Sequence, residues 1–575
     1  MRFNGLLSGL GLFTSVLAAP AAIPAPEPAS PAIEERAAKV TVAVPSGTVI
    51  GSSSGKIDSF RAIPFADPPT GSLRLKPPKK LSKPLGNFDA SGSAGPACPQ
   101  MFISTGGQDV ISEFLSDFLA IPWLTPITGQ EDCLTMTVQR PAGTKAGDKL
   151  PVLFWIFGGG FELGSAAMYD GASLLGEAID QDQPFIYVAV SYRVAGFGFM
   201  PGAEIKKDGS ANLGLLDQRL GLEWVADNIA SFGGDPDKVT IWGESAGAIS
   251  VLDQMVLYGG DVDYKGKPLF RGAIMNSGSV APAEAVDSDK GQAIYDAVVE
   301  EGGCSSASDT LECLRDLPYD KFLDAANSVP GLLSYNSLAL SYLPRPDGKV
   351  LPDSPEALIA AGRYHAVPMI NGNQEDEGTL FALFQPNLTT TAKFVDYLQK
   401  LYFNQATKEQ ITSLVNTYPA TLSTGSPYRT ALLNEVFPGF KRRAAVFGDL
   451  VFSLTRRLFL TSAAKQNPDV PAWSYLASYN YGTPILGTFH GSDLLQVFFG
   501  IWPNNAARSI RTYYFNFVHN LDPNKGVTKY ANWPEWKDSK KLMWFETANK
   551  NSLLDDDFRQ DSYEWISNNV DVLHV

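Results

Sequence analysis

The sequence FGGDPDKVTIWGESAG, residues 232–247, decides the fold of this chain. It ends in the pattern G-x-S-x-G around Ser245, with a β-branched run before it and an apolar, alanine-rich run, 248–257, after it. These runs predict a strand and a helix joined by a sharp turn, where glycines at 243 and 247 remove side chains that would collide. Correct flanks on both sides argue against a chance match in a glycine-rich chain. The pattern therefore predicts a nucleophilic serine at a helix N-terminus, which favours developing negative charge.

A second glycine-rich turn lies upstream and predicts an oxyanion hole. The apolar run 151–157 predicts a buried strand that leads directly into Gly158, Gly159 and Gly160. Without side chains at these positions, backbone N–H groups can approach a substrate oxygen. A glycine triplet alone indicates only a flexible turn. After a buried strand and upstream of a nucleophile turn, it favours an oxyanion hole that the N–H of Ala246 completes.

Several long motifs in the same order carry a family resemblance. The stretch around Ser245 and a second stretch, EDCLTMTVQRP at 131–141, match two signatures of the type-B carboxylesterase/lipase family of α/β-hydrolases, which the chain resembles from about residue 40 to its end. Other stretches look most like secreted fungal lipases and sterol esterases of that family: GGGFELGS (158–165), LDQRLGLEWVADNIASFGGDP (216–236), TLECLR (310–315), GNQEDEGTLF (372–381) and LGTFHGSDL (486–494). The resemblance implies an α/β-hydrolase fold, with a large, mostly parallel central sheet flanked by helices and a disulfide-bounded lid loop.

The general base is sought among four histidines, because in this fold it follows the acid, which follows the serine. His574 is the penultimate residue, where chain ends fray, and His519 lies in an aromatic stretch that suits a structural histidine. His365 is the first of the four. His490 lies between glycines in a loop after the apolar run 472–479, which suits a mobile, exposed imidazole. The family also places its histidine there, so we expect His490 to be the base.

The acid is expected in a run of three acidic residues, Glu375, Asp376 and Glu377, after a predicted strand at 367–371. Such a run usually lies in a solvated loop, and chemistry alone does not separate its members. The family's acid immediately precedes the glycine of its D-E-G-T/S pattern, so the resemblance implies Glu377. It thus implies a triad, Ser245, Glu377 and His490, and oxyanion donors at Gly159, Gly160 and Ala246. In such a triad the histidine moves the serine proton and the acid orients the imidazole.

Composition and the N-terminus predict a secreted enzyme. The chain has 575 residues, 44% of them hydrophobic, and a net charge of −15, which argues against nucleic acid and anionic membranes as partners. Residues 1–18 have the basic start, short apolar run and small residues of a signal peptide, and the Ala/Pro-rich residues 19–36 predict an unstructured leader or propeptide remnant. Residues 37–575 are expected to form a single catalytic domain without a transmembrane anchor. Asn387 heads an N-glycosylation sequon.

Four cysteines in a secreted chain predict two disulfides, for which three pairings exist. The family pairs its cysteines locally, so the resemblance implies the pairs Cys98–Cys133 and Cys304–Cys313. The cysteines lack C-x-x-C spacing and the histidines are scattered. We therefore expect no metal site, and no cofactor.

The segment between Cys98 and Cys133 bears most on the substrate. Its stretch DVISEFLSDFLAIPW, 109–123, places apolar side chains on one helical face, namely Ile111, Phe114, Leu115, Phe118 and Leu119. Such a pattern usually marks a helix packed on the core. Its position in a disulfide-tied loop of a lipase-like chain instead favours a lid, about 98–133, that covers the active site when closed and meets a lipid–water interface when open.

We therefore expect a secreted, extracellular serine lipase that hydrolyses apolar carboxylic esters, triacylglycerols or sterol esters or both, through an acyl-enzyme on Ser245. Its partners would be a small-molecule or lipid ester and, transiently, a lipid–water interface, without nucleic acid. One alternative is a carboxylesterase for small soluble esters. A cholinesterase-like activity is the least favoured form of this alternative. It is suggested by Trp123, ten residues before Cys133, where cholinesterases place a choline-binding tryptophan. The surrounding loop, however, is aliphatic and lipase-like. A non-catalytic adhesion protein resembling neuroligins is disfavoured, because serine, acid and base are all present.

Overall fold

The computed structural model describes residues 38–102, 129–480, 482–501, 503–547 and 549–575. Residues Ala38–Val575 form one compact unit. Several sequence predictions lie outside the described residues: the signal peptide, the leader, Trp123 and the lid residues Ile111, Phe114, Leu115, Phe118 and Leu119.

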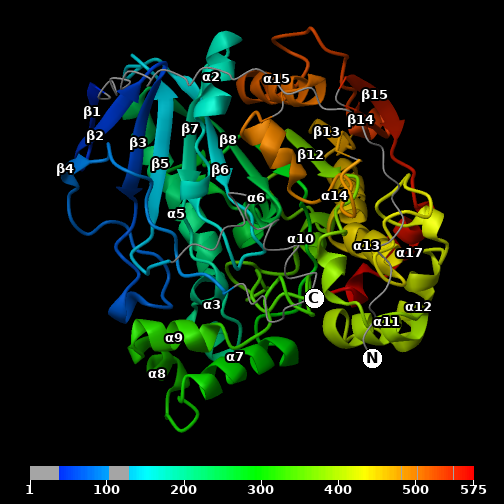
Figure 1. The fold of residues 1–575 in the computed structure, drawn as a ribbon. Coiled ribbons are helices and arrows are strands. Elements are labelled where there is room, and N and C mark those ends of the chain that lie inside the picture. The colour runs from blue at the N-terminus through cyan, green and yellow to red at the C-terminus, as the bar shows by residue number, and fades with distance from the viewer. Residues whose placement is uncertain (1–37, 103–128, 481, 502, 548) are drawn as a thin grey trace, which may run out of the picture. The chain divides into compact units, whose positions relative to one another are not determined.

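A large mixed sheet runs through the unit. Its strands are β1 (Ala38–Val44), β2 (Gly47–Ser54), β3 (Ile57–Pro64), β4 (Gly86–Asp89), β5 (Thr135–Pro141), β6 (Leu150–Ile156), β7 (Ile186–Val190), β8 (Gly234–Glu244), β11 (Gly272–Asn276), β12 (Met369–Gln374), β13 (Ala472–Ala477), β14 (Lys541–Thr547) and β15 (Lys550–Asp555). Their order is β1-β2-β3-β5-β7-β6-β8-β11-β12-β13-β14-β15, with β4 paired to β2 (Figure 1). A separate pair joins β9 (Asp263–Tyr264) to β10 (Lys267–Pro268).

The middle of the sheet is parallel from β7 through β6, β8, β11, β12 and β13 to β14. The pairs toward both edges are antiparallel, except that β4 pairs with β2 in parallel. The middle strands are buried runs such as IYVAV in β7, whereas β1 alternates toward solvent. This difference follows because helices cover both faces of a parallel sheet. The large, mostly parallel central sheet that the resemblance implies is therefore present.

Helices cover the sheet and extend beyond it (Figure 1). They are α2 (Ala172–Asp180), α3 (Ala195–Gly198), α4 (Ala203–Asp208), α5 (Leu213–Asn228), α6 (Ala246–Val256), α7 (Asp289–Glu301), α8 (Thr310–Asp316), α9 (Tyr319–Ala326), α10 (Pro355–Ala360), α11 (Thr391–Tyr397), α12 (Lys408–Asn416), α13 (Phe440–Gly448), α14 (Leu454–Gln466), α15 (Asn505–Asn520), α16 (Trp536–Ser539) and α17 (Gln560–Asn568). The part of the chain that the structure describes also contains three π-helical turns, η6 (Leu398–Tyr402), η8 (Asp449–Ser453) and η9 (Leu494–Phe498). None of the helices within the described ranges is long and apolar enough to cross a membrane.

The buried apolar side chains form two clusters. The first surrounds the central sheet and includes helices such as α6. The second includes side chains of α11, α12 and α13 and Ile566 of α17, together with residues of the loops and turns between them. Figure 1 shows these four helices gathered beside the sheet, in yellow-green and red. The unit therefore has a sheet core and a smaller helical core.

Both disulfides that the resemblance implies are present. Cys98 and Cys133 have Cα atoms 5.0 Å apart, and Cys304 and Cys313 have theirs 5.8 Å apart. The first bond joins the two ends of the segment that contains the predicted lid. The second joins the loop after α7 to α8.

Candidate active site

Ser245 lies at the turn between β8 and α6, as the G-x-S-x-G pattern predicts. Its backbone has φ 57° and ψ −127°, a conformation that non-glycine residues rarely adopt and that is held by its surroundings. The Ser245 N–H donates to the carbonyl oxygen of Asn276, at the end of β11, over 2.9 Å. The side chain is thus presented at the carboxyl end of the parallel strands, where α/β sheets place their sites.

The glycines of the turn are required by main-chain contacts. A Cβ at Gly243 would lie 2.3 Å from the carbonyl group of Gly247, and a Cβ at Gly247 would lie 2.1 Å from the Ile156 carbonyl oxygen. A Cβ at Gly278 would lie 2.6 Å from the Ser245 carbonyl oxygen. These obstacles are backbone atoms, which cannot move aside as a flexible side chain can.

His490 and Glu377 complete a hydrogen-bonded chain with Ser245. His490 Nε2 is 2.7 Å from Ser245 Oγ, and His490 Nδ1 is 2.6 Å from Glu377 Oε2. The other carboxylate oxygen of Glu377 accepts the N–H of Gln374 over 2.7 Å. The structure therefore brings together the serine, histidine and acid that the resemblance implies, in the geometry of a nucleophile, a base and its orienting group.

The environment of His490 differs from the sequence prediction of an exposed, mobile imidazole. Its side chain is only 8% exposed. The rings of Phe381 and Phe452 lie 5.2 and 4.5 Å from the imidazole, centroid to centroid. The prediction was wrong because glycines on either side of a residue describe its local backbone, whereas its burial here comes from distant segments.

Three carboxyl groups surround this imidazole. Burial alone would lower the pKa of His490, but Glu377, Glu244 and Asp493 together hold that pKa above its usual value. Glu244 Oε1 is 3.5 Å from His490 Nε2, and burial raises the pKa of Glu244 to about 8. Burial also raises the pKa of Asp493 to about 6, although Asn276 Nδ2 donates to its carboxylate over 2.8 Å. The site is thus suited to an imidazolium that forms during reaction.

Asp376 has a different task from its neighbour Glu377. It is fully buried, and its Oδ2 accepts the N–H of Thr488, two residues before His490, over 2.9 Å. Its Oδ1 accepts the Ser426 hydroxyl and the Tyr428 N–H, both over 2.8 Å. Asp376 therefore joins the acid loop to the histidine loop.

Glu375 is less deeply buried, with a side chain 11% exposed, and it pairs with the more exposed Arg429, whose Nε lies 2.9 Å from its carboxylate. The three consecutive acids thus have three environments: a partly exposed ion pair, a buried clamp and a partner for the imidazole. The solvated loop that such a run usually indicates does not describe Asp376 and Glu377, which are 0% and 1% exposed. No pattern in the run itself separates them, because their partners come from residues 426–429 and 488–490.

Free backbone donors lie beside Ser245. Gly159 and Gly160 have φ of 115° and 64°, which glycine adopts readily. Among the described residues, the N–H groups of Gly159, Gly160 and Ala246 donate to no protein acceptor. A Cβ at Gly158 would lie 2.9 Å from Ser245 Cβ, so the glycine turn adjoins the serine. The arrangement can stabilise an oxyanion on a carbonyl attacked by Ser245.

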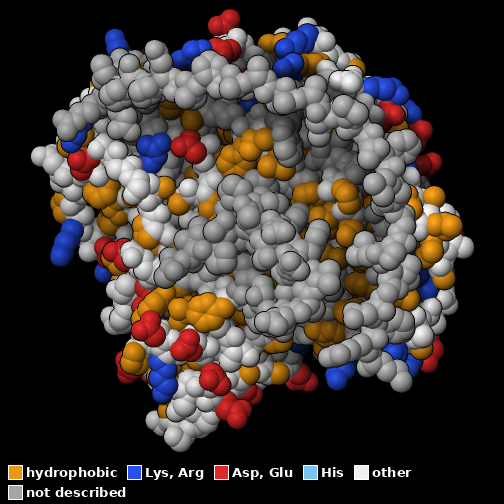
Figure 2. All heavy atoms as spheres, viewed as in Figure 1, with side chains coloured by type: hydrophobic (Ala, Val, Ile, Leu, Met, Phe, Trp, Pro, Cys, Tyr) orange, Lys and Arg blue, Asp and Glu red, His pale blue; other side chains and the backbone are white. Residues whose placement is uncertain are grey.

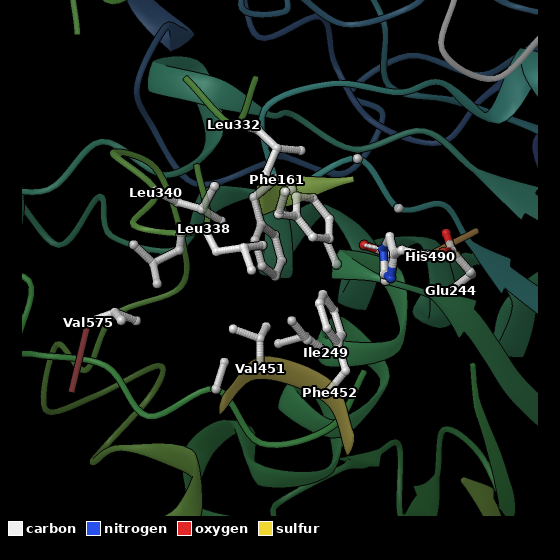
Figure 3. A pocket seen from close by; sticks show the side chains of 18 of the residues that line it. Phe161, Glu244, Ile249, Leu332, Leu338, Leu340, Val451, Phe452, His490 and Val575 are labelled. Atoms are coloured by element: carbon white, nitrogen blue, oxygen red, sulfur yellow. Dashed lines mark hydrogen bonds and ion pairs between the residues drawn. The ribbon is translucent and has the colours of Figure 1, made fainter. Parts of the chain in front are cut away.

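An apolar cavity extends from Ser245. Figure 3 shows His490 and Glu244 at one end of it, Val575 at the other, and Phe161, Phe452 and Ile249 between them. Its walls come from both hydrophobic clusters and include residues of all three π-helical turns: Tyr402, Leu450, Val451, Phe452 and Leu494. Five leucines of the loop after α9 also contribute: Leu332, Leu333, Leu338, Leu340 and Leu343. Hydrophobic side chains also gather toward the middle of the face in Figure 2, with charged ones mainly at its margin.

Two of the other three histidines have hydrogen-bond partners of their own. His365 Nε2 is 3.2 Å from the Phe270 carbonyl oxygen, and His574 Nε2 is 2.9 Å from Glu356 Oε1. His519 lies in α15, the helix that its aromatic stretch suggests. Asn387 is exposed, as a glycan acceptor must be, and its glycosylation stays a prediction.

Comparison with known proteins identifies one matching family and several similar proteins. A model of the carboxylesterase family matches residues 38–565. "Secreted triacylglycerol lipase LIP1" of Gibberella zeae is 81% identical, with 100% of both chains covered. "Secreted lipase 1" of Botryotinia fuckeliana is 57% identical over 94% of this chain and 95% of its own. The crystal structure of Aspergillus niger EstA is similar with a TM-score of 0.78 at 27% identity, covering 94% of this chain and 99% of that one.

Proposed function

This chain belongs to the carboxylesterase family, and we propose that it uses Ser245 to hydrolyse long-chain carboxylic esters, triacylglycerols or sterol esters or both. It is a secreted carboxylic ester hydrolase. The names of these two fungal relatives, among others found, support the lipase part of the proposal. Lid function of residues 98–133 stays a prediction from the sequence.

The proposed first half-reaction transfers the acyl group to Ser245. His490 Nε2, 2.7 Å from Ser245 Oγ, takes the hydroxyl proton as the oxygen attacks the ester carbonyl. The carbonyl oxygen becomes an oxyanion and accepts the free N–H groups of Gly159, Gly160 and Ala246. His490 then gives the proton to the departing alcohol oxygen, which leaves an acyl-enzyme.

The second half-reaction releases the acid. His490 takes a proton from water, whose oxygen attacks the acyl-enzyme carbonyl, and returns a proton to Ser245 Oγ as the acyl bond breaks. Throughout, Glu377 holds the imidazole through Nδ1 and stabilises its charged form, while its own second oxygen is fixed by the Gln374 N–H.

The apolar cavity beside Ser245 is the observation that carries the substrate proposal. Each methylene of an acyl chain buried in it contributes roughly 0.8 kcal/mol. Leucine and phenylalanine side chains line most of its length. A carboxylesterase for small soluble esters gains nothing from such a wall, because a short acyl group does not reach it.

A hydrolysis panel tests this function. We expect the parent protein to hydrolyse p-nitrophenyl palmitate, triolein or cholesteryl oleate at least as efficiently as p-nitrophenyl acetate and tributyrin, and Ser245→Ala to be inactive on all of them. Triolein and cholesteryl oleate separate the glycerol and sterol alternatives. Activity on the acetate and tributyrin alone would overturn the proposal in favour of the soluble-ester alternative.

A further inference from the structure

Glu162 is a buried carboxyl group beside the oxyanion glycines that the proposed reaction does not use. It is 1% exposed. Burial raises the pKa of Glu162 to about 8, against the backbone N–H groups of Leu332, Tyr342 and Ser341, which favour its charged form. Placing a carboxyl group in such surroundings is costly unless its hydrogen bonds compensate. The position of those bonds therefore indicates what the residue does.

The backbone of Glu162 is part of the oxyanion turn. Its N–H donates to the Gly159 carbonyl oxygen over 3.1 Å, and its own carbonyl oxygen accepts the Met101 N–H over 3.0 Å. Residues adjacent in sequence to Met101 and close to Glu162 are paired as well. Gln100 Nε2 donates to the Gly164 carbonyl oxygen over 2.7 Å, and Gln100 Oε1 accepts the Gly164 N–H over 3.2 Å. The Glu162 backbone is therefore held on both sides.

The side chain of Glu162 reaches the wall of the apolar cavity. Its Oε2 accepts the Leu332 N–H over 2.6 Å. Gly331 permits this approach, since a Cβ there would lie 3.3 Å from the same oxygen. Leu332 begins the stretch, up to Leu343, that contributes five leucines to the cavity.

Leu332 in turn packs on an oxyanion glycine. Its Cδ2 lies only 2.8 Å from where a Cβ would stand on Gly160. Figure 3 shows Leu332 beside Phe161, on the same side of the cavity as Leu338 and Leu340. The position of the Leu332 backbone therefore sets both the start of the acyl wall and its distance from the oxyanion hole.

We propose that Glu162 is a positioning residue that holds Leu332 against Gly160 and thereby sets the preference of the enzyme for long acyl chains. The inference rests on the proposed function of this site. The backbone of Glu162 is fixed in the oxyanion turn, and its carboxyl group bonds the Leu332 N–H. Glu162 therefore fixes the position of the cavity wall relative to the oxyanion turn. Without that acceptor the partly buried Leu332 N–H is left unpaired, a state that the loop relieves by shifting. Long acyl chains touch this wall along its length, whereas an acetyl group does not reach most of it.

The test compares kcat/KM for p-nitrophenyl palmitate with that for p-nitrophenyl acetate. We expect Glu162→Leu, which keeps the bulk and removes the acceptor, to lower this ratio about tenfold. Glu162→Gln keeps an oxygen for the Leu332 N–H and should stay within about twofold of the parent. Leu332→Ala should lower the ratio as Glu162→Leu does, and the double variant should fall no further, because both act on one contact.

Two further variants keep the test decisive. Gly331→Ala leaves every polar group in place but puts a Cβ 3.3 Å from Glu162 Oε2, closer than most such contacts, so we expect it to lower the same ratio even if Glu162→Leu fails to fold. Asp58→Asn is the matched control, a buried carboxyl on β3 that pairs with Arg140, remote from the cavity lining. It should lower the thermal midpoint without moving the ratio.

An unchanged ratio in Glu162→Leu or Gly331→Ala, or additive losses in the double variant, overturns the positioning role. A parent without palmitate activity overturns the proposed function instead.

Discussion

The serine side and the histidine side of the proposed triad are held in place by different means. On the serine side, β8 and α6 meet at a turn whose glycines contact other main-chain atoms, and Ser245 itself bonds through its backbone to Asn276. On the histidine side, irregular loops carry Glu377 and His490. These loops are joined mainly by side chains, such as that of Asp376 to the Thr488 N–H.

The difference indicates how each side can fail. Main-chain packing tolerates no added atom, so a substitution there acts on the stability of the sheet and the turn. Side-chain hydrogen bonds between loops can be removed one at a time, so a substitution there acts on the position of the imidazole while the sheet survives. The predictions below exploit this contrast.

The largest effect is expected from Ser245→Ala. Removing the nucleophile should lower kcat by at least about 10⁴-fold, since the members of such a triad act as a unit. A fluorophosphonate probe should label the parent protein and not the variant, and circular dichroism should be unchanged. Retention of more than about one part in a hundred of kcat would show that another group is the nucleophile.

Gly247→Ala tests the main-chain side. The new Cβ would lie 2.1 Å from the Ile156 carbonyl oxygen and 2.8 Å from that of Phe157, so we expect a loss of about 3 kcal/mol or more in the free energy of unfolding, measured with urea. Gly176→Ala in α2 is the matched control, because a Cβ there meets nothing within 4 Å. It should be neutral or stabilise by up to about 1 kcal/mol. Equal urea midpoints for the two variants would contradict the main-chain argument.

Asp376→Asn tests the side-chain side. Its amide oxygen can replace one carboxylate oxygen, but its NH₂ then faces the N–H of Thr488 or of Tyr428. An unpaired buried donor costs about 1–3 kcal/mol, and the histidine loop can relieve this cost by shifting, which moves the imidazole away from Ser245. We therefore expect kcat to fall roughly 10- to 100-fold with little change in KM. Ser426→Ala, which removes a bond of Asp376 but none to the histidine loop, should cost much less activity. Equal losses of kcat in the two variants would refute the clamp.

The pH profile tests how the carboxyl groups around His490 change its pKa. Only neutral His490 accepts the Ser245 proton, so kcat/KM should rise with pH. Because the surrounding carboxyl groups, despite burial, hold the pKa of His490 above its usual value, the rising limb should be centred above the usual 6.5. Below that midpoint the rate falls about tenfold per pH unit. A limb centred below 6.5 on a soluble ester would mean that burial outweighs the carboxylates.

The smallest effect is expected from Glu375→Gln. Glu375 lies next to the clamp in sequence, and its side chain is 11% exposed, but its partner Arg429 is 38% exposed, so water screens the ion pair and we expect it to contribute only about 0–1 kcal/mol. Activity should stay within about twofold of the parent, and the urea midpoint should move little. A loss as large as that of Asp376→Asn would show that the three acids cannot be assigned separate tasks.

The sequence predicts well what is local. The nucleophile turn requires a strand, two glycines and a helix within a short stretch, and the structure places β8 and α6 there, with the helix beginning two residues before the predicted apolar run. The runs 151–157 and 367–371 became β6 and β12, and 472–479 became β13. Family resemblance supplied the disulfide pairs, which spacing alone left open.

What the sequence does not reveal is long-range. The burial of His490 depends on Phe381 and Phe452, the clamp of Asp376 on Thr488, and the role of Glu162 on Leu332. In each case the partner is far along the chain and has no characteristic pattern of its own. Glu244 and Asp493 stood inside recognised motifs, but only the fold places their carboxyl groups around the imidazole.

The cavity beside Ser245 lies at the seam between the sheet core and the helical core. An acyl chain bound in the cavity would contact side chains of both cores. Its binding would therefore add contacts between the sheet core and the helical core. By thermodynamic linkage, a ligand present at a hundred times its dissociation constant stabilises the native state by about 2.7 kcal/mol. We therefore expect the enzyme with substrate or product bound in this cavity to unfold at a higher temperature than the same enzyme without ligand.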